Sequence, residues 1–145
     1  MTFLLDVNVL VALIDPTHVS HDLAHNWFAA ASGGWATCPI TENGVLRIVS
    51  HPRYPNTPGS PAVVAGVLLR LRRRSGHSFW PDDISLLDAK RFDPDKLLSH
   101  KQLTDSYLLA LALAHGGALA SLDRRLGVAA VRGGSDGLHL IGSSP

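Results

Sequence analysis

Hydrophobic residues along this chain alternate between short continuous runs and longer stretches in which they recur every three or four positions. Short runs are typical of buried parallel strands, and the longer periodic stretches are typical of helices with one apolar face. The expected strands are residues 2–5, 35–40, 78–80, 118–122 and 137–141. The expected helices are residues 18–31, 41–49, 63–74, 84–92 and 104–115.

The alternation of strands and helices predicts a fold of the α/β class. Parallel strands joined by helical crossovers bury both faces of their sheet, so we expect an α/β/α sandwich with a central parallel sheet of about five strands. Residues 137–141 are expected to form an edge strand. A length of 145 residues suits one domain, which we expect to span residues 1–145.

Composition narrows the functional classes. Hydrophobic residues make up 46% of the chain and charged residues 17%, which excludes a disordered tail protein. Thirteen Lys and Arg against twelve Asp and Glu give a net charge of +1, so any surface for nucleic acid must be a local patch. The only cysteine, Cys38, has no partner for an internal disulfide, which indicates a reduced, cytoplasmic setting. No apolar run is long enough to span a membrane.

Four acidic residues fall where the expected strands end. Asp6 follows the first strand, Glu42 the second and Asp123 the fourth, while Asp105 lies in the first turn of the helix that leads into the fourth strand. The carboxyl ends of parallel strands share one edge of the sheet, so we expect these acids to gather there. Crowded carboxylates repel one another, and a hard divalent cation such as Mg²⁺ or Mn²⁺ would supply the counter-charge.

Three of these acids also have a purely structural interpretation. Asp105 and Glu42 suit the first turn of a helix, where a negative charge complements the macrodipole, and Asp123 suits a turn. Asp6 is different, because it directly ends an apolar strand and precedes another apolar run, where an enclosed carboxylate needs a partner.

Four sequence blocks carry a resemblance to a known family. In order along the chain they are LLDVNVLVAL (4–13), PITENGVLRI (39–48), LTDSYLLALA (103–112) and LASLDRRL (119–126). Together they resemble the PIN domain, and within it the VapC ribonucleases of bacterial VapBC toxin–antitoxin pairs. The resemblance spans nearly the whole chain and includes all four acids.

The resemblance implies an endoribonuclease toxin that depends on Mg²⁺, with Mn²⁺ able to substitute. Water activated by the cation would attack an RNA phosphodiester and leave 5′-phosphate and 3′-hydroxyl ends. Asp6 and Asp105 would be direct ligands, Glu42 a ligand or the group that orients the water, and Asp123 a group acting through water. The polar neighbours that would steady the site are Asn8, Thr41 and Ser121. A segment of a VapB-type antitoxin would wrap the groove that holds the four acids and block the acidic site. The toxin would form a homodimer.

Basic residues and histidines give weaker signals. Arg124, Arg125 and Arg47 are candidates for RNA phosphate contacts, with Arg53 a further candidate. The run of arginines at 70 and 72–74 has two interpretations, a soluble helix end that complements its own dipole or a set of phosphate contacts. Three histidines, His18, His21 and His25, recur at helical spacing. They could hold a metal, form a polar helix face or lie near the RNA entry.

Two further features bear on partners and on competing functions. The tryptophans at 27, 35 and 80 are expected in the core or at a subunit contact. The helix from Asp105 to His115 is apolar almost all round, which favours a symmetric dimer to cover it. A haloacid-dehalogenase-like phosphotransferase also places an acid after its first strand, but it needs a second Asp where this chain has Asn8. A non-catalytic PIN-like interaction module is the other alternative, although it would be expected to lose one or more of the acids.

Overall fold

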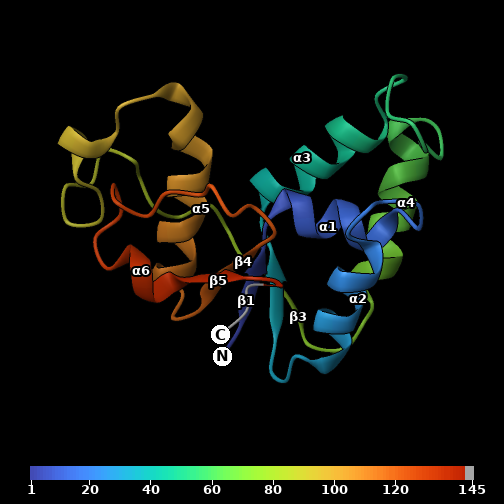
Figure 1. Cartoon of the computed structure of the whole chain (residues 1–145), viewed down its shortest axis with the longest axis horizontal. Helices are drawn as coiled ribbons and strands as arrows, with labels where there is room; N and C mark the ends of the chain where they lie inside the picture. The colour runs from blue at the N-terminus through green and yellow to red at the C-terminus, as the bar shows by residue number, and fades with distance from the viewer. Residues whose placement is uncertain (143–145) are drawn as a thin grey trace.

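The computed structural model describes residues 1–142 and contains a five-stranded sheet in the order β3-β2-β1-β4-β5 (Figure 1). Every neighbouring pair of strands is parallel, which confirms the predicted fold class. The strands are β1 (Phe3–Leu5), β2 (Trp35–Thr37), β3 (His77–Phe79), β4 (Ala118–Ser121) and β5 (Leu138–Leu140). The first strand in the sequence therefore lies at the centre of the sheet, and β5 lies at an edge as expected.

Helices cover both faces of the sheet, with four on one side and two on the other (Figure 1). The first group comprises α1 (Val7–Ile14), α2 (His21–Ala30), α3 (Pro39–Val49) and α4 (Pro61–Arg72). The second group comprises α5 (Leu103–Ala114) and the short α6 (Gly134–Gly137). Single 3₁₀ turns, Pro94–Lys96 and His100–Gln102, lead into α5.

The alternation of side chains along β1 divides the core in two. Leu4 packs with residues of α5 in one buried cluster, and Leu5 packs with residues of α1, α3 and α4 in the other. Both leucines have no exposed surface. Successive strand residues point to opposite faces, so a short strand buried on both sides has to be apolar at every position.

Two expectations about helices were wrong. Residues 7–14 form α1, which we did not predict because five consecutive buried residues leave no helical period to detect. Residues 84–92 form turns instead of a helix. The Ser85 hydroxyl accepts from the Leu87 amide and the Asp88 carboxylate accepts from the Lys90 amide, and such local bonds compete with helical ones.

Element boundaries shifted by a few residues elsewhere. The second strand ends at Thr37 instead of residue 40, because Pro39 occupies the first position of α3, where its missing N–H costs nothing. The fifth helix begins at Leu103, one residue before its expected N-cap.

The apolar helix α5 is covered by its own chain. Residues 106–112 are all buried, under partners that include Phe92, Leu126 and Val131 from the segments flanking α5 and β4. The need for a second copy to cover this helix, on which the sequence argument for a dimer rested, is therefore absent. No helix among residues 1–142 is both long and apolar enough to cross a membrane.

Candidate active site

Asp6 stands at the carboxyl end of the central strand and is almost fully buried, with 6% of its surface exposed. It is the N-cap of α1, and its Oδ1 accepts a hydrogen bond of 2.8 Å from the Val7 amide. Its other oxygen accepts a bond of 2.7 Å from the Ser121 hydroxyl. Burial raises the pKa of Asp6 above its ordinary value, although these hydrogen bonds oppose the rise.

A polar network joins Asp6 to the end of β4. In the Asn8 side chain, Nδ2 donates to the Ser121 hydroxyl at 3.1 Å and Oδ1 accepts from the backbone amide of Leu122 at 3.0 Å. The Ser121 hydroxyl also accepts from the Asp123 amide at 3.1 Å. Asn8 and Ser121 thus link the Asp6 carboxyl to the backbone at Leu122 and Asp123, while their supporting role at the site stays a prediction.

Asp105 and Asp123 face the same space as Asp6. The three acids line one cavity of about 390 Å³, and a second cavity of about 360 Å³ shares Asp105 and Asp123 with it. Burial, together with the charges of Asp6 and Asp123, raises the pKa of Asp105 to about 6. A carboxyl in the first turn of a helix is ordinarily favoured as an anion, so burial, together with the two neighbouring charges, outweighs the effect of the helix dipole on this pKa.

The chemistry of these three acids fits a hard divalent cation. No Lys, Arg or His among residues 1–142 forms an ion pair with any of them, although Lys101 and Arg125 line the second cavity beside Asp105 and Asp123. In the same part of the chain, no three His, Cys, Asp or Glu side chains are already gathered as a metal-binding group. The three acids thus share a cavity lining without forming a closed set of ligands, and a cation there would take only some of its ligands from carboxylates and the rest from water.

Glu42, the fourth predicted acid, does not line either of these cavities. Its Oε2 accepts from the Thr37 hydroxyl at 2.7 Å and lies 3.2 Å from Nη1 of Arg72 in α4. The carboxylate is thus directed between α3 and α4, in a hollow lined also by Leu68 and Leu69. Thr41 is fully buried beside it, and its hydroxyl bonds the backbone of Cys38, which makes it a cap of α3.

The basic residues named from the sequence occupy different places. Arg125 lines the second acid-lined cavity, whereas the Arg124 guanidinium donates to the Gly142 carbonyl. Arg47 and Arg53 line a separate pocket beside α3. In the arginine run, Arg72 pairs with Glu42 and Arg74 lies over the Phe28 ring, and the other two line no acid-bearing cavity.

Two of the three histidines singled out in the sequence bond the backbone of α1, and the third lines the cavity of the three acids. The His21 ring bonds the Ala12 carbonyl at 2.7 Å and the His25 ring bonds the Leu13 carbonyl at 3.1 Å, so both satisfy the end of α1. His18 lines the cavity of the three acids, close to the expected RNA entry. Tyr54 lines that cavity too, and its place in a proline-rich loop gave no signal in the sequence.

Trp35 and Trp80 are buried in the two core clusters, as expected. Trp27 is half-buried, and its indole N–H donates to the His139 ring at 2.9 Å. None of the three tryptophans lines either acid-bearing cavity.

Comparison with known proteins agrees with this geometry. The family model of the PIN domain matches residues 3–131. A solved structure, the toxin VapC20 from Mycobacterium tuberculosis, which is described as cleaving the sarcin–ricin loop, superposes with a TM-score of 0.63. The match covers 90% of this chain and 96% of that one at 11% sequence identity, so it supports the fold alone. The chain belongs to the PIN-domain family.

Closer relatives define the branch within that family. Ribonuclease VapC44 of Mycobacterium tuberculosis is 46% identical over 134 residues, which cover 92% of this chain and 94% of the relative. Ribonuclease VapC39 of the same organism is 43% identical over 134 residues, which cover 92% and 96%. The branch is that of the VapC ribonucleases, metal-dependent endoribonuclease toxins with RNA as substrate and a VapB antitoxin as partner. The haloacid-dehalogenase alternative has no support.

Proposed function

We propose that this chain hydrolyses RNA phosphodiester bonds at the cavity lined by Asp6, Asp105 and Asp123, using Mg²⁺ with Mn²⁺ as a substitute. The observation that carries the proposal is the convergence on one cavity of three carboxylates, which form no ion pair within residues 1–142, from the end of β1, from α5 and from the turn after β4. A divalent cation, when bound, neutralises these acids, acidifies the attacking water and stabilises charge on the phosphate oxygens.

The residues of the chain have distinct tasks in this proposal. Asp6 and Asp105 hold the cation directly, and Asp123 acts through water. Ser121 steadies the Asp6 carboxyl and the backbone of Asp123 through its hydrogen bonds, and Asn8 supports Ser121. Arg125, which lines the same cavity as Asp105 and Asp123, is placed to meet a phosphate.

Glu42 has a secondary task, since its carboxylate is already paired with Arg72. We assign it to orienting water or substrate at the margin of the site. The remaining elements of the proposal follow from the family: products with 5′-phosphate and 3′-hydroxyl ends, a cytoplasmic location, a homodimer, and a VapB-type antitoxin that covers the acids.

Cleavage of cellular RNA by the purified, antitoxin-free chain tests the proposal. We expect discrete fragments with Mg²⁺ or Mn²⁺, and loss of these fragments with EDTA or in Asp105→Asn. Asp22→Asn is a matched control, because Asp22 is an exposed acid in the first turn of α2 and lines none of the cavities described. Cleavage that survives in Asp105→Asn would refute the site. Absence of cleavage by the folded, unaltered chain would favour a non-catalytic interaction module.

A further inference from the structure

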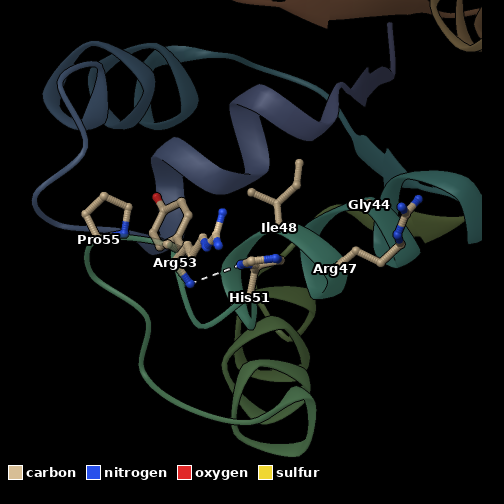
Figure 2. A pocket seen from close by; sticks show the side chains of 7 residues that line it. Gly44, Arg47, Ile48, His51, Arg53 and Pro55 are labelled. Atoms are coloured by element: carbon tan, nitrogen blue, oxygen red, sulfur yellow. Dashed lines mark hydrogen bonds between the residues drawn. The ribbon is translucent and has the colours of Figure 1, made fainter.

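The pocket beside α3 that Arg47 and Arg53 line adjoins the cavity of the three acids. It has a volume of about 720 Å³ and lies between the outer side of α3 and the loop that follows it (Figure 2). Ile48 and Tyr54 line both this pocket and the acid-lined cavity, so the two spaces are neighbours across one shared wall. A linear polymer held at the acids would pass over this wall into the pocket.

The pocket presents positive charge that the protein does not neutralise. Arg47 and Arg53 are exposed, and neither guanidinium forms an ion pair or a hydrogen bond with any of residues 1–142. His51 stands between them in Figure 2, and its ring accepts a hydrogen bond of 3.0 Å from the Arg53 amide. In a chain whose net charge is only +1, two unpaired guanidinium groups form the local basic patch that an RNA ligand needs.

The pocket also has apolar walls. Ile48 is 46% exposed, and Tyr54 and Pro55 line the same pocket. A nucleoside has an apolar face and a neighbouring phosphate, and single-stranded RNA is bound by surfaces that combine flat apolar side chains with cations. This pocket offers both kinds of contact.

A buried carboxylate fixes the loop that forms this wall. Asp15, at the end of α1, is 6% exposed and accepts hydrogen bonds from the Tyr54 hydroxyl and, at 2.8 Å, from the Asn56 amide. Its Oδ1 accepts two more bonds from Thr17. The Tyr54 ring is therefore held in one orientation before any ligand binds, which lowers the entropic cost of binding.

We propose that this pocket is a nucleotide subsite for the RNA strand, in which Arg47 and Arg53 each bind a phosphate near the scissile bond and the nucleoside packs on Ile48 and Tyr54. The inference rests on the ribonuclease function proposed above and extends the substrate path beyond the acids. Asp15 is a positioning residue for this subsite, because it acts only through Tyr54 and Asn56.

Binding of RNA to a cleavage-deficient chain tests the subsite. We would measure the fluorescence anisotropy of a labelled random-sequence RNA of about ten nucleotides with the full chain carrying Asp105→Asn, over a series of salt concentrations. Adding Arg47→Gln and Arg53→Gln should weaken binding about tenfold or more, because two charge-assisted contacts are lost. The slope of log affinity against log salt should become shallower by about 1.4, the value for two phosphates of a single strand.

Two further variants separate specific from general effects. Arg70→Gln with Arg73→Gln removes the same charge from exposed arginines outside the pocket, and should leave affinity and slope nearly unchanged. Ile48→Ala should weaken binding without changing the salt slope, because it removes only an apolar contact. The double variant Arg47→Gln with Arg53→Gln is called the pocket pair. An equal loss of RNA affinity in the pocket pair and in the Arg70→Gln, Arg73→Gln variant would overturn the subsite, and so would unchanged RNA binding by the pocket pair.

The outcomes also distinguish this inference from the proposed function. A chain that cleaves RNA while its pocket pair binds RNA normally refutes the subsite alone. If the Asp105→Asn chain binds no RNA and the unaltered chain cleaves none, both proposals fail together. A glutamate-rich peptide serves as the competing ligand: if the pocket pair loses the peptide but keeps RNA, the pocket is a surface for an acidic protein segment and the subsite is wrong.

Discussion

The carboxylate of Glu42 lies 3.2 Å from the guanidinium of Arg72, so this acid is committed to α4 and not to the cavity of the other three acids. Thr37 strengthens the commitment with a hydrogen bond of 2.7 Å to the same Glu42 oxygen. The four acids that resemble one another in the sequence thus fall into two groups: three that form no ion pair within residues 1–142 and one that is already paired.

The first prediction concerns metal affinity. Glu42→Gln should weaken Mn²⁺ binding less than Asp105→Asn does, because Glu42 forms an ion pair with Arg72 whereas Asp105 lines the cavity of the three acids. Isothermal titration calorimetry on the two variants and the unaltered chain gives the comparison. Equal losses would mean that Glu42 leaves Arg72 when the metal binds, which would contradict the division into two groups.

The second prediction concerns the cost of keeping Asp105 ionised. Its pKa of about 6 in the folded chain lies above the ordinary value of 3.8. Between these pH values the folded chain binds more protons than the unfolded chain, so the free energy of unfolding falls as pH rises through this range. In EDTA at pH 7.5, Asp105→Asn should therefore raise the free energy of unfolding by about 1–2 kcal/mol, allowing for partial screening by solvent.

The difference between the two chains should shrink from pH 6 downward and vanish below about pH 4, where the carboxyl is protonated in both folded and unfolded states. Urea unfolding at several pH values measures it. With Mn²⁺ present the order should reverse, because the unaltered chain gains more from binding. A variant less stable than the parent in EDTA at pH 7.5 would show that Asp105 carries no electrostatic penalty.

The third prediction concerns the Asp15 tether. Burial opposes its ionisation, but hydrogen bonds from Tyr54, Asn56 and Thr17 outweigh burial and hold its pKa below the ordinary value. The stabilisation is present above the unfolded-state pKa, near 3.8, and is lost as pH falls below it toward the folded-state value. Asp15→Asn should cost about 2 kcal/mol at pH 7, since several bonds to a charged acceptor are weakened.

Urea unfolding at pH 7 and at pH 3 checks this expectation, with Asp22→Asn as the exposed control. If Asp15 positions the pocket wall, Asp15→Asn should also raise the KM for RNA more than it lowers kcat, whereas a purely structural role would leave KM unchanged in the fraction that remains folded. An identical cost at both pH values would exclude ionised Asp15 as the source of the stability.

The fourth prediction concerns the histidines at the end of α1. His21→Ala should destabilise the fold by about 1 kcal/mol, because the Ala12 carbonyl at the C-terminal end of α1 loses its side-chain partner. His18→Ala should cost less, since the His18 ring accepts only the Ser20 amide. Zn²⁺ should not raise the melting temperature of the unaltered chain, because His21 and His25 use a ring nitrogen on backbone carbonyls. Thermal unfolding with and without Zn²⁺ decides between a cap and a metal site.

Much of the fold could be predicted from the sequence because both sides of the sheet are buried. The strands β1 and β4 are buried, mainly apolar runs, so their positions and the place of Asp6 and Asp123 beyond their ends followed from the hydrophobic pattern alone. The helix over 7–14 escaped notice for the same reason, since a helix buried on nearly all sides has no polar face to mark its period.

The details of the site could not be predicted, because they depend on contacts between distant segments. Nothing in the sequence pairs Glu42 with Arg72, or places Tyr54 against both Asp15 and the acid-lined cavity. Residues 84–92 show a related limit: hydrogen bonds from Ser85 and Asp88 decide their conformation, while their apolar spacing favours a helix.

The central place of β1 has a consequence for the timing of synthesis. Asp6 leaves the ribosome early, but Ser121, which bonds it from the neighbouring strand β4, lies 115 positions later in the chain. Until β4 has been synthesised, β1 has one open edge, and Asp6 lacks both the Ser121 hydroxyl and the neighbouring Asp123. The three acids can therefore gather only after β4 and the turn that follows it have been synthesised, and until then the nascent chain has no formed nuclease site.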